Sequence, residues 1–232
     1  MPSTRLLAAQ RMAFTRPIRG VIFDMDGVLL DTERFYTEVT QEIVGRFGKI
    51  FDWSIKAEMV GRPAIESSRH LVRVLDLPIT AEAYLAEREE RLLELLVGAE
   101  PMPGAVELVH ALHERQIPIA VATSSSRHLF ELKTRRHSAW FNRFDAIVVG
   151  DDPRVLQGKP APDIFLVAAG EIGVPAPACL VVEDAPSGIA AARAAGMQVL
   201  GVPDPGMDPA RLADADLVVS SLLAVRLAIF GL

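Results

Sequence analysis

Two aspartates separated by one residue, Asp24 and Asp26, follow the short apolar run Val21–Phe23 and precede Gly27. β-Branched and aromatic residues bounded by turn residues predict a buried strand, so both carboxylates should leave it on the same side. Two like charges held close together and away from water need a cation, or a proton on one of them. The pair is therefore a candidate catalytic or metal site, although Asp26-Gly27 is also an ordinary turn sequence.

Hydroxyl groups form a second polar cluster, Thr123–Ser126, directly after the apolar run Ile117–Ala122, and Arg127 follows them. Hydroxyls and backbone N–H groups at a strand-to-helix turn can bind phosphate oxygens. The same residues would serve equally well as an ordinary helix N-cap. The cluster alone does not decide between these two interpretations.

A single cation and a pair of acids occupy two further loops. Lys159 lies in the sequence GKPAPD, whose prolines predict a rigid turn that holds the lysine near the sheet. Glu183 and Asp184 follow the apolar run Cys179–Val182 and offer the oxygen ligands that Mg²⁺ prefers. The alternatives are a solvated surface lysine and two acids favoured by the dipole of the next helix.

Short apolar runs alternate with helical patterns through most of the chain. This alternation predicts an α/β fold with a Rossmann-like parallel sheet covered by helices on both faces. Ligands of such sheets bind at the carboxyl ends of the strands, where the four polar clusters fall. The predicted strands are residues 21–23, 117–122, 146–149, 180–182, 199–202 and 217–219, and the predicted helices are 105–116, 129–136, 162–172 and 187–195.

The segment 33–100 interrupts this alternation, because it contains helical periodicity and no convincing strand. Phe35 and Val39 begin a row of apolar residues with a spacing of four, as on the buried face of a helix. We therefore expect a helical cap over residues 33–100, inserted into a core made of residues 17–32 and 101–232. An insertion beside the first loop of the core can close over the site as a lid.

Composition limits the classes of function. The chain has 232 residues and a formal net charge of -6, which argues against a broad nucleic-acid-binding surface. No apolar run approaches the ~20 residues of a membrane span, so no membrane partner is expected. The single cysteine, Cys179, can form no internal disulfide and fits a core position in a cytoplasmic protein. Residues 1–16 contain arginines and no acids, and we expect a poorly ordered extension, with a transit peptide as the alternative.

The four clusters occur in the order Asp-x-Asp, Thr-Ser, Lys and Glu-Asp, each in its own loop. From about Ile18 onward this pattern resembles the haloacid dehalogenase-like superfamily. The insertion resembles the helical cap of the subgroup that contains phosphatases and β-phosphoglucomutase. The resemblance implies that Asp24 is a nucleophile that forms an aspartyl phosphate, and that Asp26 is the general acid and base.

The resemblance also implies Mg²⁺ as the cofactor and a small phosphorylated molecule as the substrate. The implied metal ligands are the Asp24 carboxylate, the Asp26 backbone carbonyl and Asp184, with Glu183 as a further ligand or behind them. The implied phosphate-binding residues are Thr123, Ser124, Ser125 and Lys159, and the candidates for substrate contact are Tyr36, Arg62 and Arg127. Two other stretches, Lys133–His137 and Asp151–Pro153, are interpreted as a solvated helix end and a turn.

Hydrolysis is predicted over the other activities of the superfamily. Dehalogenases lack the second carboxylate, here Asp26, and β-phosphoglucomutases carry a histidine where this chain has Tyr36 and an arginine where it has Ala64. Several stretches, including Asp31–Tyr36 and Glu183–Pro186, resemble the pseudouridine-5′-phosphatases. The expected substrate is therefore a nucleotide or sugar phosphate, with pseudouridine 5′-phosphate among the candidates. A phosphosugar mutase is the first alternative, and a non-catalytic binding protein on the same scaffold is the second.

Overall fold

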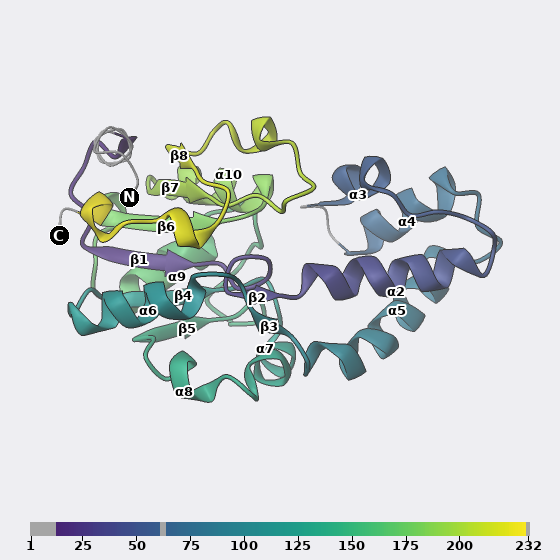
Figure 1. Ribbon diagram of the computed structural model, residues 1–232, viewed down its shortest axis with the longest axis horizontal. Helices are drawn as coiled ribbons and strands as arrows, with labels where there is room; N and C mark the ends of the chain where they lie inside the picture. Colours follow the sequence, from purple (N-terminus) through teal and green to yellow (C-terminus); the bar gives the residue numbers. More distant parts are fainter. Residues whose placement is uncertain (1–12, 61–63, 231–232) are drawn as a thin grey trace.

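A parallel sheet forms the centre of the protein in the computed structural model, which describes residues 13–60 and 64–230 (Figure 1). The six strands lie in the order β5-β4-β1-β6-β7-β8, and every neighbouring pair is parallel. Because β1 lies between β4 and β6, the chain crosses to both sides of it, which creates a crevice at the carboxyl ends of the strands. The predicted α/β fold class is confirmed. The strands are β1 (Gly20–Phe23), β4 (Ile119–Ala122), β5 (Ala146–Val148), β6 (Cys179–Glu183), β7 (Gln198–Gly201) and β8 (Leu217–Val218).

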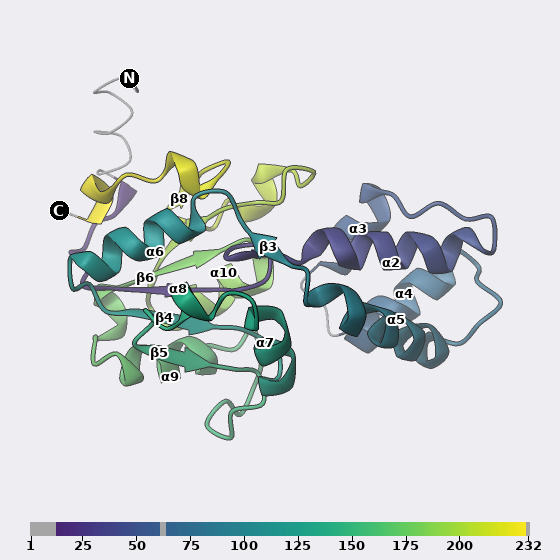
Figure 2. The same ribbon diagram turned by 60° about the horizontal axis from the view of Figure 1, so that its bottom comes forward.

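Helices cover both faces of this sheet (Figures 1 and 2). They are α6 (Ala105–Glu114), α7 (Arg127–Thr134), α8 (Ser138–Phe141), α9 (Asp163–Glu171) and α10 (Pro186–Ala194), with 3₁₀ turns at Ala176–Ala178, Pro209–Leu212, Leu222–Ala224 and Leu227–Phe230. Val21 and Phe23 of β1 belong to the apolar core that includes α6 and α8, whereas Ile22 belongs to the core that includes α9 and α10. Burial on both faces explains why the central strands are uninterrupted apolar runs.

A second unit, made of helices, lies beyond the carboxyl ends of the strands (Figures 1 and 2). Its helices are α2 (Glu33–Gly45), α3 (Trp53–Met59), α4 (Ala64–Val74) and α5 (Ala81–Leu96). Two antiparallel strands of two residues each, β2 (Leu30–Asp31) and β3 (Glu100–Pro101), join this helical unit to the sheet. The sequence predicts neither α3 nor these strands, because such short elements carry too little periodicity to be recognised.

The N-terminal region packs on the core earlier than expected. Phe14 is buried, and the backbone N–H and C=O of Arg16 exchange hydrogen bonds of 3.0 and 3.1 Å with the side chain of Gln198. The expected extension over residues 1–16 is therefore too long, and its residues 1–12 lie outside the described part of the chain.

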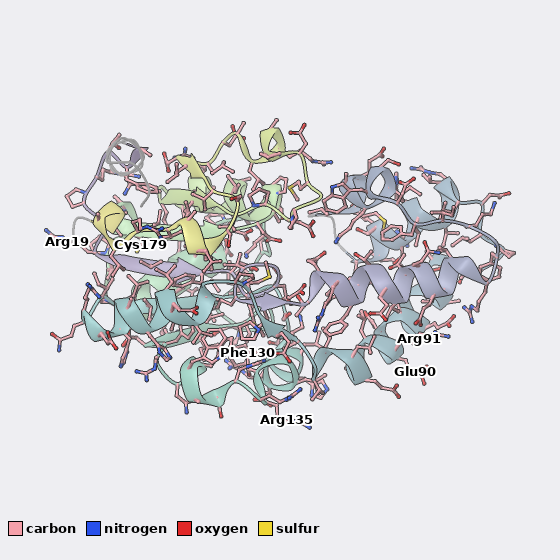
Figure 3. All side chains as sticks on the ribbon, viewed as in Figure 1. Arg19, Glu90, Arg91, Phe130, Arg135 and Cys179 are labelled. Carbon is pink, nitrogen blue, oxygen red and sulfur yellow. The ribbon has the colours of Figure 1, made fainter. Side chains whose placement is uncertain are left out.

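Cys179 lies inside the core, as its sequence context predicts (Figure 3). Its thiol donates to the carbonyl of Val174 at 3.7 Å, and burial raises its pKa to about 11. The thiol is therefore protonated at neutral pH. Among the described residues, no helix combines the length and the apolar character needed to cross a membrane.

Candidate active site

Asp24 and Lys159 form a buried ion pair at the carboxyl edge of the sheet. The backbone N–H of Asp24 donates to the carbonyl of Val182 at 2.9 Å, which extends the β1–β6 ladder into the crevice. The Lys159 ammonium donates to Oδ1 of Asp24 at 2.5 Å and to Oε1 of Glu183 at 2.7 Å. Its side chain is only 6% exposed, so it is a placed cation and not a solvated surface lysine.

Burial raises the pKa of Asp24 from 3.8 to about 7, and the charges of Glu183 and Asp26 add to this effect, while Lys159 opposes it. The pKa of Lys159 is raised, because its two carboxylate partners outweigh the burial that would lower it. One ammonium group is thus shared between two carboxylates, and the pKa of Asp24 lies near neutral pH. A further cation would favour its ionised form.

Asp184 is a buried carboxylate without a partner. It is 8% exposed, and among the described residues no group donates a hydrogen bond to it and no cation lies within ion-pair distance. Burial raises its pKa well above 3.8, and the neighbouring charges of Glu183 and Asp24 raise it further. The acid-rich corner formed by Asp24 and Asp184 therefore has the charge distribution of a cation site.

Two glycines make room for these acids. A Cβ atom on Gly188 would lie 1.6 Å from Oε1 of Glu183, and one on Gly27 would lie 2.3 Å from Oδ2 of Asp184. Gly27 also has a φ of +81°, which an L side chain rarely adopts. The second carboxylate oxygen of Glu183 accepts a hydrogen bond from the backbone N–H of Ala185 at 2.8 Å, so both oxygens of this carboxylate are held in place.

Asp26 is held by a cation that the sequence does not assign to the site. The Lys133 ammonium donates to Oδ1 of Asp26 at 2.5 Å, and Thr32 donates to the same oxygen at 2.7 Å. Burial opposes ionisation of Asp26, but the Lys133 charge and the hydrogen bonds from Lys133, Thr32 and Ser125 outweigh it and lower its pKa below 3.8. The pKa of Asp24 is thus raised and that of Asp26 is lowered, so Asp26 ionises more readily than Asp24 in the metal-free protein.

The interpretation of Lys133–His137 as a solvated helix end is wrong for Lys133, Thr134 and His137. Lys133 is fully buried, and His137 is buried with Nε2 2.6 Å from the carbonyl of Ala99. Arg135 and Arg136 are exposed, and Figure 3 shows Arg135 projecting away from the protein. The register of α7 accounts for Lys133 and Thr134, which follow buried Phe130 by three and four residues on its inner face, whereas His137 lies beyond α7 as the N-cap residue of α8. Asp151–Pro153 does lie in a turn, where the N–H of Asp152 donates to Val149.

The residues of the predicted hydroxyl cluster, Thr123–Ser126, have three different environments. Thr123 and Ser125 donate to Oδ2 of Asp26 at 3.4 and 3.0 Å. Ser124 is exposed and lines a cavity in front of the carboxylates. Ser126 accepts from the N–H of Leu129 as the N-cap of α7. The N-cap interpretation therefore holds for Ser126, and phosphate binding by the other hydroxyls stays a prediction.

A cavity of about 650 Å³ separates the edge of the sheet from the helical unit. Asp24, Asp26, Ser124, Ser125, Lys159, Glu183 and Asp184 line its floor, and Tyr36, Lys56, Arg88 and Leu92 are among the residues that line it from the helical unit. Its volume accommodates a small organic molecule. The structure thus brings most of the predicted site residues to one chamber that both units enclose.

The three residues predicted to contact the substrate differ in their position relative to the cavity. Tyr36 lines the cavity, with its ring centroid 5.8 Å from the Lys133 ammonium. Arg127 is directed away, because its guanidinium lies over the ring of Phe130 and within 3.5 Å of the carbonyl of Ile147. Arg62 lies outside the described residues.

Comparison with known proteins decides the family. The family model of the haloacid dehalogenase-like hydrolases matches residues 18–196. The chain belongs to this family. It is 48% identical over 220 residues to (DL)-glycerol-3-phosphatase 2 of Arabidopsis thaliana, covering 93% of this chain and 92% of the relative. It is 42% identical over 220 residues to a probable pseudouridine-5′-phosphatase of Drosophila melanogaster, covering 94% of this chain and 95% of that one.

A solved structure agrees with this membership. The HAD-family hydrolase of Deinococcus radiodurans, crystallised with bound phosphate and sodium, superposes with a TM-score of 0.77 at 28% identity, covering 93% of this chain and 96% of that one. The haloacid dehalogenase-like hydrolase described here is a phosphatase of small phosphate esters, and the prediction of a phosphoric monoester hydrolase is confirmed.

Proposed function

We propose that this phosphatase hydrolyses its substrate by covalent catalysis on Asp24, with Mg²⁺ bound beside it. The observation that carries the proposal is the convergence of Asp24, Asp26, Lys159 and Asp184 on the floor of one cavity. Lys159 supplies one positive charge for both Asp24 and Glu183, so a further cation is needed to offset the charge of Asp184.

The residues present fit a magnesium ion. Asp184 is buried and has no partner in the part of the chain that the structure describes, and its charged neighbours include Glu183 and Asp24. Among the described residues no three His, Cys, Asp or Glu side chains enclose a metal by themselves. Mg²⁺ needs no such enclosure, since one or two carboxylates with substrate phosphate and water are its usual ligands. Asp24, Asp184 and the Asp26 carbonyl would hold it, and it would offset the repulsion between the Asp24 carboxylate and the phosphate.

The side chains then divide the reaction into two steps. An oxygen of Asp24 forms a bond to phosphorus while the ester bond to the alcohol breaks. Because Asp26 is ionised in the free protein, it first takes a proton from the monoanion of the phosphate ester and then passes that proton to the leaving oxygen. Water then attacks the aspartyl phosphate, gives its proton to the Asp26 carboxylate, and releases phosphate and free Asp24. Lys159 and Ser124, which line the cavity floor, contact phosphoryl oxygens in both steps of this proposal.

The substrate is proposed to be a phosphomonoester of a sugar, polyol or nucleoside. Two relatives named for glycerol 3-phosphate and pseudouridine 5′-phosphate support this class. A mutase is less well supported, because Tyr36 stands where mutases carry a histidine. Burial raises the pKa of Tyr36, so its phenol stays protonated and is a poor base toward a sugar hydroxyl.

A panel assay tests the proposal. Phosphate release is measured with and without Mg²⁺ from glycerol 3-phosphate, pseudouridine 5′-phosphate, nucleoside monophosphates and hexose phosphates. We expect metal-dependent release that Asp24→Asn abolishes, and an acid-stable, hydroxylamine-labile phosphoenzyme on Asp24 after rapid quenching. Release by Asp24→Asn at the rate of the unmodified enzyme would exclude covalent catalysis on Asp24. Conversion of β-glucose 1-phosphate into glucose 6-phosphate with little free phosphate would identify a mutase.

A further inference from the structure

Arg88 is a cation of the cavity wall that the reaction above does not use. It lies on α5, one turn after Tyr84 and one turn before Leu92, and both Arg88 and Leu92 line the cavity. Residues four apart share one face of a helix, so this register directs Arg88 toward the chamber. Its guanidinium carbon lies 5.7 Å from the ring centroid of Tyr36 and 5.8 Å from that of Tyr84. The two aromatic rings position the side chain at cation–π distance.

The Nε–H of Arg88 is buried and has no hydrogen-bond partner among the described residues. A buried donor that is left unpaired is costly, and native structures rarely retain one without a functional reason. No carboxylate of the described chain lies within ion-pair distance of Arg88 either, although Glu87 on the same helix pairs with Arg46 and Arg91.

The other cations that line the cavity are neutralised. Lys159 contacts Asp24 and Glu183, whereas Lys56 lies 3.1 Å from Glu33 and 3.5 Å from Asp204. Arg88 is thus the cavity-lining cation, within the described residues, that has no carboxylate partner and whose Nε–H stays free for a bound molecule. A guanidinium presents several N–H groups in one plane, which suits neighbouring oxygen acceptors.

We propose that Arg88 determines specificity by donating hydrogen bonds to hydroxyl oxygens of an uncharged leaving group, as in a polyol or sugar monophosphate. The inference rests on the proposed phosphomonoesterase activity and refines its substrate class. The cavity floor binds the phosphoryl group, and Arg88 is on the opposite wall, provided by the helical unit. Three further carboxylates line the same chamber, Glu33, Glu89 and Asp204, and Lys56 offsets only one of the charges of Glu33 and Asp204, so the excess of acids disfavours a leaving group with a second negative charge.

Kinetics of Arg88→Met on matched substrates test this assignment. Glycerol 3-phosphate and ribose 5-phosphate carry hydroxyls on the leaving group, phenyl phosphate carries none, and 3-phosphoglycerate carries a carboxylate. We expect kcat/KM of Arg88→Met to fall roughly 10- to 100-fold on the first two substrates, as for a lost hydrogen bond to a charged donor. On phenyl phosphate it should stay within about threefold of the unmodified enzyme. Arg88→Lys keeps the charge without the planar donors and should recover only part of the loss.

Arg91→Met is the matched control, because Arg91 lies on the same helix and pairs with Glu42 and Glu87 outside the cavity. Its kinetics should match those of the unmodified enzyme on every substrate. The melting temperature of Arg88→Met should be equal to or above that of the unmodified enzyme, since the change removes an unpaired buried donor. A purely structural arginine would instead lower it.

Three results would overturn the assignment. Equal losses on phenyl phosphate and glycerol 3-phosphate would place Arg88 in phosphoryl binding or in the fold, and unchanged kinetics on both would exclude any contact. A preference for 3-phosphoglycerate that Arg88→Met removes would show that the ligand group is anionic. A different result, no phosphate release by the unmodified enzyme from any of the four esters, would contradict the proposed function itself.

Discussion

The Lys133 ammonium and Oδ1 of Asp26 lie 2.5 Å apart at the centre of the site, although 107 residues separate them in sequence. Lys133 also donates to Oγ of Ser125 at 2.9 Å, and Ser125 donates to the other oxygen of Asp26 at 3.0 Å. This closed set of contacts leaves the Asp26 carboxylate little freedom to rotate. Lys133 thus joins α7 to the loop after β1 and fixes the group proposed to transfer the proton.

Replacing Lys133 by methionine should slow catalysis and change its pH dependence. Without the ammonium, the pKa of Asp26 rises, because burial then acts with less opposition. The hydrolysis step needs Asp26 as a carboxylate, so the acidic limb of the kcat profile should move to higher pH. We expect kcat at neutral pH to fall by ~10²-fold, the lower end of general acid–base effects, with little change in KM. Steady-state kinetics between pH 5 and 9 measure both quantities.

Arg135→Met is the control for this change, since Arg135 lies on the same helix but is exposed. It should leave the pH profile unaltered. If Lys133→Met keeps the acidic limb of the unmodified enzyme, the ammonium does not govern Asp26, whatever the loss in rate.

Asp24 should make the metal-free protein less stable as the pH rises. Its pKa is about 7 in the folded protein and 3.8 in the unfolded chain, so the folded state binds more protons between these values. The stability contributed by this proton is complete below pH 3.8 and is lost as the pH rises through 7. Asp24→Asn cannot titrate, so its unfolding free energy minus that of the unmodified protein should increase between pH 4 and 8.

Urea unfolding in EDTA across this range measures that difference. Adding Mg²⁺ at pH 8 should stabilise the unmodified protein more than Asp24→Asn, because the ion favours the ionised form of Asp24. A difference that is constant with pH would show that Asp24 has an ordinary pKa in the folded protein.

Lys56 links the helical unit to the sheet. It comes from α3, and its ammonium lies 3.1 Å from Glu33, where α2 begins, and 3.5 Å from Asp204, in the loop after β7. Asp204→Asn should weaken the link and favour a more open arrangement of the two units. We expect KM to rise about two- to fivefold at low salt, as for an ion pair worth ~0.5–1 kcal/mol, with a smaller difference in high salt. Asp208→Asn, at an exposed position four residues further on, serves as the control. A KM that is unchanged at all salt concentrations would contradict a role of this pair in closure.

The sequence was sufficient to predict the floor of the site, since parallel strands deliver the residues that follow them to one edge. Asp24, Lys159 and Asp184 were found in this way, and burial in the structure accounts for their altered pKa values. Lys133 and Arg88 were missed, because each looks like part of a charged run on a helix. Both nevertheless occupy apolar positions, Lys133 three residues after buried Phe130 and Arg88 four before buried Leu92. A charge in the buried register of an amphipathic helix was the signal that could have revealed them.

Gly27 should be required for metal binding rather than for folding. A Cβ at this position would lie 2.3 Å from Oδ2 of Asp184, so Gly27→Ala must displace that carboxylate. Gly48 also has a positive φ, +68°, but a Cβ there would meet nothing within 4 Å. Both alanine variants should lose about 1 kcal/mol or somewhat more through backbone strain, as expected for alanine at positive φ. Only Gly27→Ala should weaken Mg²⁺ binding, by at least tenfold in calorimetric titrations without substrate. Equal Mg²⁺ affinity in the two variants would show that Asp184 does not hold the metal.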